Sequence, residues 1–448
     1  MNFSKIKELL FARAKELNLC DYDIYFCRNT DRFAGTVNHE LSAVTSGTAG
    51  GVCFRCAVNG KIGSASTESL EEEDLLALVP RALSNASVID TDEEAIFYAP
   101  GEKDVYGSVN CRTPKLPDAA TIRHDALEIE EALYHATELA ADGTESGVGC
   151  GEVELSLSNS KGLSLSRHAA MCYQYANLVV KKGEEAVYGF SVKADEKPDV
   201  AGIVSEAKKD ALSKLDAGTA RTGRTDVIFS EKEVRTLLSA FEGIFNGKNA
   251  LEGLSLLKGK EGTKIAADCV TLIDDPFYAE NPMQIPFDAE GVPTREKALV
   301  KDGCLETLLY DLTTAKKAGA APTGNAVRAT YASPVSISHF CLRLAPGQYT
   351  HEELLKELGD GLYITELKGL HAGANAETGD FSIESAGFEV KNGEMAGAVR
   401  GFTLAGNFYQ LLLSVEKIGS CVKMGMPGFH TLAAPEILVR GLSVAGGD

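Results

Sequence analysis

The sequence reads VCFRCAVNGKIGSAS over residues 52–66, with two runs of mostly apolar and small side chains around the pair Asn59-Gly60. Asn and Gly accept the positive φ angles that a two-residue primed turn requires. Strand-like runs on both sides of such a pair are typical of antiparallel pairing. The stretch therefore predicts a β-hairpin that turns at residues 59–60.

Helix-like and strand-like patterns follow one another irregularly outward from this hairpin. Apolar residues at three- and four-residue steps predict helices near residues 3–17, 69–83, 118–140, 199–215, 230–245 and 404–418. Shorter apolar runs predict strands near residues 23–28, 152–158, 163–167, 172–181, 270–274, 298–310, 332–344 and 388–404. A regular succession of strand, helix and strand is absent, so we expect the α+β class rather than a doubly wound sheet.

A small polar segment, DAGTARTGRT at residues 216–225, separates two parts of the chain. Boundaries between domains commonly fall in exposed segments that are rich in Gly and polar residues. We therefore predict two mixed α/β domains. The first is an N-terminal α+β domain over residues 1–220, and the second is a C-terminal domain over residues 221–448 that is rich in β-strands and Gly.

Composition narrows the class of protein. The chain has 448 residues, and 44 Lys+Arg against 64 Asp+Glu give a net charge of −20, which argues against binding to nucleic acid. No apolar run approaches the roughly 18 residues that span a bilayer, and the N-terminus has no apolar signal core. Eleven Cys without framework spacing indicate reduced thiols. We expect a cytoplasmic protein that contacts no membrane.

Four side chains on one predicted helix are candidate metal ligands. His124, Glu128, Glu131 and His135 follow at offsets of four, seven and eleven residues, which places them on one helical stripe. The apolar residues of this helix lie on the opposite face. We therefore interpret the stripe as a charged face in solvent.

Two further pairs offer metal-binding side chains. Cys53 and Cys56 form a CxxC within a predicted strand, where positions three apart project from opposite faces, so we expect two packed thiols. His339 and Cys341 share a strand face but lack a third ligand, and we expect them to lie in the core or to line a cavity.

Sequence motifs of known hydrolases are incomplete or absent. His39-Glu40 and His351-Glu352 begin like HExxH, but the second His is missing from both, and we interpret them as polar surface. GxSxG, a Walker loop and GxGxxG spacing do not occur. From the residues alone, the chain is a cytoplasmic α+β protein of unknown activity.

Eight short segments in a particular order resemble one protein family. They are NGKIGSAST (59–67), NSKGLSLS (159–166), IDDP (273–276), PFDAEGVPTREKALVKDG (286–303), APTGNA (321–326), NAETGDFSIESAGFEVKNGE (375–394), AGN (405–407) and the terminal ILVRGLSVAGG. Together they resemble the TldD/PmbA family, whose older description is modulator of DNA gyrase. TGDFS followed by SAGF resembles the PmbA (TldE) branch.

The resemblance implies a cytosolic metallopeptidase assembly. In it, a TldD-type subunit carries a zinc helix, HExxxH with a later Cys, and pairs with a PmbA/TldE-type subunit. The assembly degrades unfolded peptides and removes leader segments from modified peptides, which enter an internal chamber as an added strand.

The zinc helix of the catalytic branch falls on Ser239, Ala240, Phe241, Glu242, Gly243 and Ile244 in this sequence. Both His ligands and the general-base Glu are absent, and zinc hydrolysis needs ligands and a base beside bound water. Glu242 lies about 200° round an ideal helix from the Glu position, so we expect it to face elsewhere. Cys421 falls near the family's metal-binding Cys and would be an orphan ligand. We expect no catalytic residue and no metal in this chain, and zinc only in a TldD-type partner.

The resemblance thus implies a PmbA/TldE-type subunit that serves in assembly and substrate binding. Its expected partners are a TldD-type subunit or a second copy of itself, together with unfolded or modified peptides. Two alternatives stay open, an autonomous metallopeptidase or other hydrolase with an unrecognised site, and a regulatory protein linked to DNA gyrase. His371 and His430 could touch a peptide, although we prefer structural or surface roles for both. We expect the substrate groove at Thr323, Gly324 and Asn325 and at Thr378, Gly379, Asp380, Phe381 and Ser382.

Overall fold

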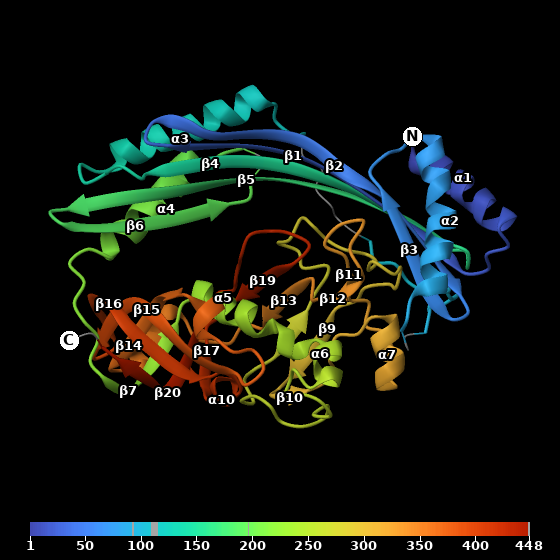
Figure 1. Cartoon of the computed structure of the whole chain (residues 1–448). Helices are drawn as coiled ribbons and strands as arrows, with labels where there is room; N and C mark the ends of the chain where they lie inside the picture. Colours follow the sequence, from blue (N-terminus) through green and yellow to red (C-terminus); the bar gives the residue numbers. More distant parts are fainter. Residues whose placement is uncertain (92–93, 109–114, 196, 447–448) are drawn as a thin grey trace.

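The computed structural model describes residues 1–91, 94–108, 115–195 and 197–446. Figure 1 shows two layers, in which a long curved sheet from the N-terminal half lies over a body of smaller sheets from the C-terminal half. Both halves mix helices with strands, which confirms the α+β class. Within the described ranges, no helix is both long and apolar enough to cross a membrane.

One six-stranded antiparallel sheet forms the N-terminal layer, with strand order β3-β2-β1-β4-β5-β6. The elements of this layer are α1 (Phe3–Glu16), β1 (Tyr22–Val37), β2 (Glu40–Val58), β3 (Lys61–Thr67), α2 (Glu72–Val88), α3 (Ala119–Ala136), β4 (Glu145–Asn159), β5 (Ser164–Lys182), β6 (Glu185–Lys193) and α4 (Val200–Ser213).

The two halves of this sheet repeat one arrangement. Each half has a helix, three strands and a second helix, first as α1-β1-β2-β3-α2 and then as α3-β4-β5-β6-α4, and the halves meet where β1 pairs with β4. The second helix of each half lies directly on a glycine of an edge strand. A Cβ on Gly63 would lie 2.1 Å from the Ala82 carbonyl oxygen, and a Cβ on Gly189 would lie 2.1 Å from that of Ala207. Glycine is needed at both positions because the helix backbone approaches so closely.

The predicted hairpin is confirmed. Val58 pairs with Lys61 across the turn, and Asn59 and Gly60 have φ angles of 50° and 78°. The two cysteines of this region lie on opposite faces, as expected. Cys56 is buried in the core beneath α1 and α2, whereas Cys53 is buried in the core between the sheet and the C-terminal body. Both are free thiols.

Two six-stranded sheets and a two-stranded ladder form the C-terminal body. Their strand orders are β16-β15-β14-β7-β20-β17, β10-β9-β8-β13-β19-β18 and β11-β12, and β16 also pairs with β20. The first elements are β7 (Gly223–Phe229), α5 (Glu231–Phe241), the 3-10 helix η1 (Glu242–Phe245), α6 (Gly247–Glu252), β8 (Leu272–Asp274), β9 (Lys297–Lys301), β10 (Cys304–Leu305), α7 (Leu312–Ala318), β11 (Ala326–Val327) and β12 (Ser336–Ile337). The remaining elements are β13 (Cys341–Leu344), α8 (His351–Leu358), β14 (Gly361–Lys368), α9 (Leu370–Gly373), β15 (Asp380–Lys391), β16 (Glu394–Asn407), α10 (Phe408–Leu413), β17 (Val415–Ile418), β18 (Lys423–Met424), β19 (Thr431–Ala434) and β20 (Ile437–Ala445).

The prediction of one helix over residues 404–418 is wrong. The segment begins as the end of β16, continues as the short helix α10 and ends as β17. Val415 and Ile418 are buried in a strand, at a spacing that a helix would also bury. Because one apolar spacing serves both structures here, periodicity alone could not separate them.

The two layers dock through an apolar patch and a buried charge cluster. Leu155 and Leu157 of the sheet share a core with Phe287 and Ala289 of the body. Beside them, the Arg55 guanidinium of the sheet binds both carboxylate oxygens of Asp23. The same guanidinium attracts the charge of Glu290, a buried residue of the body.

We predict that the free energy of unfolding decreases as pH rises from 5.5 to 8. Burial raises the pKa of Asp288 and of Glu290, and the charge of Asp288 raises the pKa of Glu290 further. In this range both carboxyl groups are already ionised in the unfolded chain but still hold protons in the folded chain, so rising pH favours unfolding. The side chain introduced by Glu290→Gln does not ionise. In this variant the free energy of unfolding should therefore fall by about 1–3 kcal/mol less over the same pH range. Denaturant unfolding at both pH values measures it.

The control is Glu377→Gln, which changes an exposed residue and should leave the pH dependence unchanged. Equal pH dependence in Glu290→Gln and in the unmodified chain would contradict the prediction.

Candidate functional site

Helix α5 exposes one face to a cavity because its other face is held in the core. Ser230 caps the helix, where its hydroxyl oxygen accepts a hydrogen bond from the Glu233 backbone N–H at 3.4 Å. The Phe241 ring stacks on Phe408, with 4.4 Å between the ring centroids. The buried apolar face consists of Val234, Leu237, Leu238 and Phe241.

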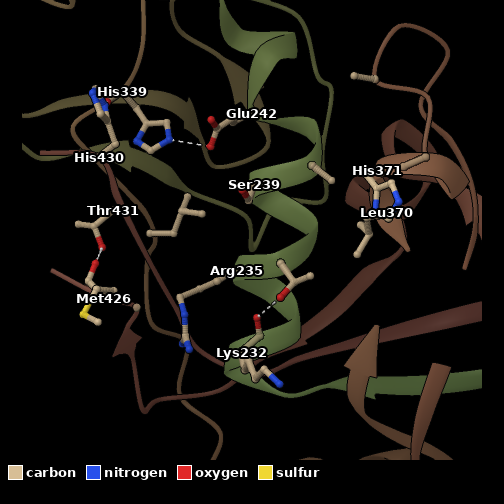
Figure 2. Close-up of a pocket in the computed structure, with 16 residues that line it drawn as sticks. Lys232, Arg235, Ser239, Glu242, His339, Leu370, His371, Met426, His430 and Thr431 are labelled. Carbon is tan, nitrogen blue, oxygen red and sulfur yellow. Dashed lines mark hydrogen bonds and ion pairs between the residues drawn. The ribbon is translucent and has the colours of Figure 1, made fainter. Parts of the chain in front are cut away.

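A cavity of about 770 Å³ lies against the outward face of α5 (Figure 2). In Figure 2, Leu370 and His371 lie on one side of this helix, and Met426 and Thr431 lie on the other. Lys232 and Arg235 contribute two positive charges to the lining. The lining contains one carboxylate, that of Glu242. The full lining is Lys232, Arg235, Thr236, Ser239, Ala240, Glu242, His339, Leu370, His371, Ala374, Ala376, Gly425, Met426, His430, Thr431 and Leu432.

Glu242, His339 and His430 are linked at one end of this cavity. The Glu242 carboxylate lies 2.8 Å from His339 Nε2, and His430 Nδ1 donates to the His339 carbonyl oxygen at 2.9 Å. Burial lowers the pKa of His430, so its ring is neutral at pH 7. Among the described residues, buried His339 Nδ1 has no hydrogen-bond partner. The end of the cavity thus offers a carboxylate paired with an imidazole.

The position of Glu242 corrects our expectation that it faces elsewhere. That expectation assumed an ideal helix through residue 244, but α5 ends at Phe241, where φ is −116° and ψ is 1°. Residues 242–245 form a tighter 3-10 turn, which changes the angular step per residue. The turn directs Glu242 into the cavity wall and buries Ile244 at 1% exposure.

A fully buried carboxylate holds the chain segment that carries His339. Asp274 accepts hydrogen bonds from the backbone N–H groups of Phe340 (2.8 Å) and Cys341 (3.2 Å). Its other oxygen accepts from Lys297 Nζ (3.0 Å) and Asn325 Nδ2 (2.7 Å). Burial raises the pKa of Asp274, but the Lys297 charge and these hydrogen bonds outweigh burial and leave it below its usual value.

The residues expected at a substrate groove lie outside the lining of this cavity. Thr323, Gly324 and Asn325 are buried, and Asn325 also donates to the Ser338 carbonyl oxygen at 2.9 Å, behind the wall. The second segment runs from a turn at Thr378 into the first residues of β15 and follows the lining residues Ala374 and Ala376. Its members are Thr378, Gly379, Asp380, Phe381 and Ser382. The peptide groove at these residues stays a prediction.

The remaining candidate residues of the sequence analysis are dispersed. His371 lines the cavity, and Cys421 is an exposed free thiol outside its lining. His124 and Glu128 are 76% and 57% exposed, as expected for a face in solvent. Within the part of the chain that the structure describes, His124, Asp125 and Glu128 form the one group of at least three His, Cys, Asp or Glu donor atoms within 4.8 Å of one another.

The residues on α5 and η1 do not fit a zinc ion of the HExxxH type. The three key positions hold Ser239, Ala240 and Ile244, and the last of these lies in the core. A hydrolytic zinc site needs about three nitrogen, sulfur or carboxylate ligands around one point. Glu242, His339 and His430 do not converge closely enough to supply them.

Family models and curated relatives match most of the chain. Residues 222–446 match the PmbA/TldA metallopeptidase C-terminal domain, and residues 22–86 match PmbA/TldA metallopeptidase domain 1. A Methanothermobacter thermautotrophicus protein named Metalloprotease is 30% identical over 403 residues, 86% of this chain and 85% of that protein. Metalloprotease PmbA of Escherichia coli O157:H7 is 29% identical over 244 residues, 54% of this chain and 51% of that protein.

Solved structures share the whole fold. A Thermotoga maritima protein described as a candidate modulator of a DNA gyrase has a TM-score of 0.90 and 28% identity, covering 99% of this chain and all of that chain. TldE from Thermococcus kodakarensis has a TM-score of 0.89 over 98% of this chain, at 23% identity, which shows likeness of fold. These matches define a metalloprotease-like protein. The chain belongs to the PmbA/TldD family.

Several of the cavity residues were not assigned to a site by the sequence analysis. Lys232, Arg235 and Thr236 carry a detectable signal, because they lie on the α5 face opposite the apolar residues. Glu242 carries none, since its direction depends on where the α-helix changes to a 3-10 turn.

We predict that Asp274→Asn lowers the free energy of unfolding by about 3–5 kcal/mol, because it leaves Lys297 buried without its counter-charge. Lys297→Met, added to Asp274→Asn, should recover part of the loss. The matched control is Asp268→Asn, which removes an exposed ion pair with Lys264 and should cost less than about 0.5 kcal/mol. Denaturant unfolding compares the three variants, and equal stability of the two single variants would contradict the prediction.

Proposed function

We propose that this chain is the peptide-binding, non-hydrolytic subunit of a cytosolic metallopeptidase assembly. Its partner is a TldD-type subunit or a second copy of the chain, and zinc belongs to a TldD-type partner alone. Its ligands are unfolded or modified peptides.

One observation carries this proposal. The α5 helix faces a large cavity, but at the zinc-helix positions it presents Ser239 and Ala240, and Ile244 of η1 is buried in the core. Neither a hydroxyl, a methyl nor a buried aliphatic side chain can replace an imidazole ligand or a general base. The cavity is therefore suited to binding rather than to zinc-dependent hydrolysis.

The shape and lining of the cavity support peptide binding. Its volume of about 770 Å³ lies within the usual range for ligand sites. The edge strand β18 lies beside it, and the next residues, Gly425 and Met426, form part of the wall. Edge strands bind extended peptides through main-chain hydrogen bonds, so sequence-tolerant capture is possible here.

Neighbouring cavities give an extended ligand more room. His430 lines both the 770 Å³ cavity and a second one of about 210 Å³, while Phe429 lines the second and a third of about 380 Å³. The second and third are bounded by both layers. A peptide several residues long could therefore contact the loop around residues 429–430 from more than one side.

The names of relatives agree with this role. The charge of the chain limits the kinds of partner that it can bind. The Escherichia coli relative is named Metalloprotease PmbA, and a structural neighbour is named TldE. A net charge of −20 disfavours direct contact with DNA and with anionic membranes.

We predict that the purified chain alone contains far less than one zinc per molecule and does not cleave unfolded peptides. Elemental analysis and a peptide-cleavage assay with and without chelator test both points. Mixing with a TldD-type subunit that has an intact HExxxH should give chelator-sensitive cleavage and a stable complex on size-exclusion chromatography.

Stoichiometric zinc with chelator-sensitive cleavage by this chain alone would contradict the proposal. Chelator-resistant cleavage that Glu242→Gln abolishes would instead assign hydrolysis to the Glu242–His339 pair, which is a second candidate function.

We predict that Ile244→His lowers the free energy of unfolding by about 2–4 kcal/mol, because it places a polar ring of different shape in a filled core, where its nitrogen atoms lack hydrogen-bond partners. Ser239→His, on the exposed wall, is the matched control and should change stability by less than about 0.5 kcal/mol. The triple variant Ser239→His, Ala240→Glu, Ile244→His should not gain stoichiometric zinc. Denaturant unfolding and elemental analysis measure these effects, and stoichiometric zinc in the triple variant would show that residue 244 can reach the cavity.

A further inference from the structure

A second cavity, of about 210 Å³, lies between the two layers. Tyr25 and Arg167 border it from the sheet, and Phe287, Arg328 and Phe429 border it from the body. It adjoins the 770 Å³ cavity at His430, which lines both. Its size suits a single side chain or chain end rather than a whole peptide.

Arg328 is incompletely satisfied in this cavity. Its guanidinium lies over the Tyr25 ring, 4.8 Å from the ring centroid, and Nη1 donates to the Tyr331 carbonyl oxygen at 3.5 Å. Its Nε and Nη2 atoms are buried, and neither has a hydrogen-bond partner among the described residues. A buried donor without an acceptor is unfavourable, and more so when it is charged.

The two unsatisfied atoms define the shape of the missing acceptor. Nε and Nη2 lie on the same edge of a guanidinium, which is the edge that binds both oxygens of one carboxylate. The same chain shows this geometry elsewhere. Arg55 binds the two carboxylate oxygens of Asp23 through Nε and Nη2. Arg328 presents the same edge, but no carboxylate of the described residues binds to it.

The rest of the cavity favours an anion with an apolar body. A second guanidinium, that of Arg167, lies over the Phe429 ring at 4.1 Å. The one carboxyl group in the lining, Asp288, already accepts backbone hydrogen bonds from Glu290, Val292 and Ala326. Burial also raises its pKa, which weakens its negative charge near neutral pH. Positive charge therefore predominates beside aromatic walls.

We propose that Arg328 binds a carboxylate of the peptide ligand, held as a bidentate pair in the 210 Å³ cavity with Arg167 as a second positive charge. The carboxylate is either the C-terminal one or that of an acidic side chain. This inference rests on the proposed peptide-binding function. It adds a direction for the bound peptide, because a peptide in the 770 Å³ cavity would extend its anionic group past His430 towards Arg328.

Four fluorescent pentapeptides test the proposal on the full chain by anisotropy. They carry a free C-terminal carboxylate, a C-terminal amide, an amide with an internal Glu, and the same amide with Gln instead. At least one carboxylate peptide should bind about tenfold to a hundredfold more tightly than its neutral counterpart. An advantage in the first pair identifies the C-terminus, and an advantage in the second pair identifies the side chain.

Variants locate the effect. Arg328→Gln should abolish the preference, and Arg328→Lys, which keeps the charge but loses the two-pronged edge, should reduce it to about threefold or less. Arg81→Gln, an exposed residue of α2, is the matched control and should retain the full preference. Thermal unfolding of each variant checks folding, and the comparison of the four peptides on the unmodified chain does not depend on any variant.

Equal binding of both peptides within each pair would overturn the proposal, even though peptide binding itself would then stand. If no peptide binds, the proposed function fails. The carboxylate site is then judged by the ¹⁵N-arginine spectrum, in which the Nε–H signal lost in Arg328→Lys should shift with N-acetylglycine and not with N-acetylglycinamide. An unchanged signal with N-acetylglycine would overturn the site as well.

Discussion

The carboxylate of Asp274 is the constraint on which the cavity wall depends. It is fully buried, and it accepts hydrogen bonds from Lys297, from Asn325 and from two backbone N–H groups just after His339. Asp274 is the last residue of β8, and Lys297 and Cys341 begin the two strands that pair with it, β9 and β13, whereas Asn325 and Phe340 lie outside regular elements. In a low-dielectric interior, a charge of this kind must be fully satisfied, so it fixes irregular chain that apolar packing alone would leave loosely placed.

The cavities follow from this rigid body and from the sheet above it. For the two smaller cavities the body holds one wall and the sheet holds the other, and the loop around Phe429 and His430 lies between adjacent spaces. Arginines collect at these spaces in a chain that is strongly acidic overall. These spaces therefore have a more positive potential than the acidic chain around them.

The sequence predicts local features better than directions in space. The hairpin at Asn59-Gly60 and the opposite burial of Cys53 and Cys56 depend on turn chemistry and strand alternation, and both are confirmed. The direction of Glu242 depends on a helix that changes form at Phe241, where tertiary packing decides. The unsatisfied edge of Arg328 depends on a sheet and a body far apart in sequence, so no local pattern could indicate it.

The repeated half-sheets have a consequence for how the N-terminal layer is held together. β1 and β4 meet antiparallel, as equivalent strands do across a two-fold axis in a symmetric dimer. Here both copies belong to one polypeptide, so their association is independent of protein concentration and costs only the entropy of closing the connection. The side chains of one half can therefore change without the same change in the other half. The sheet keeps the stability of a symmetric interface, while its two halves present different side chains to the C-terminal body.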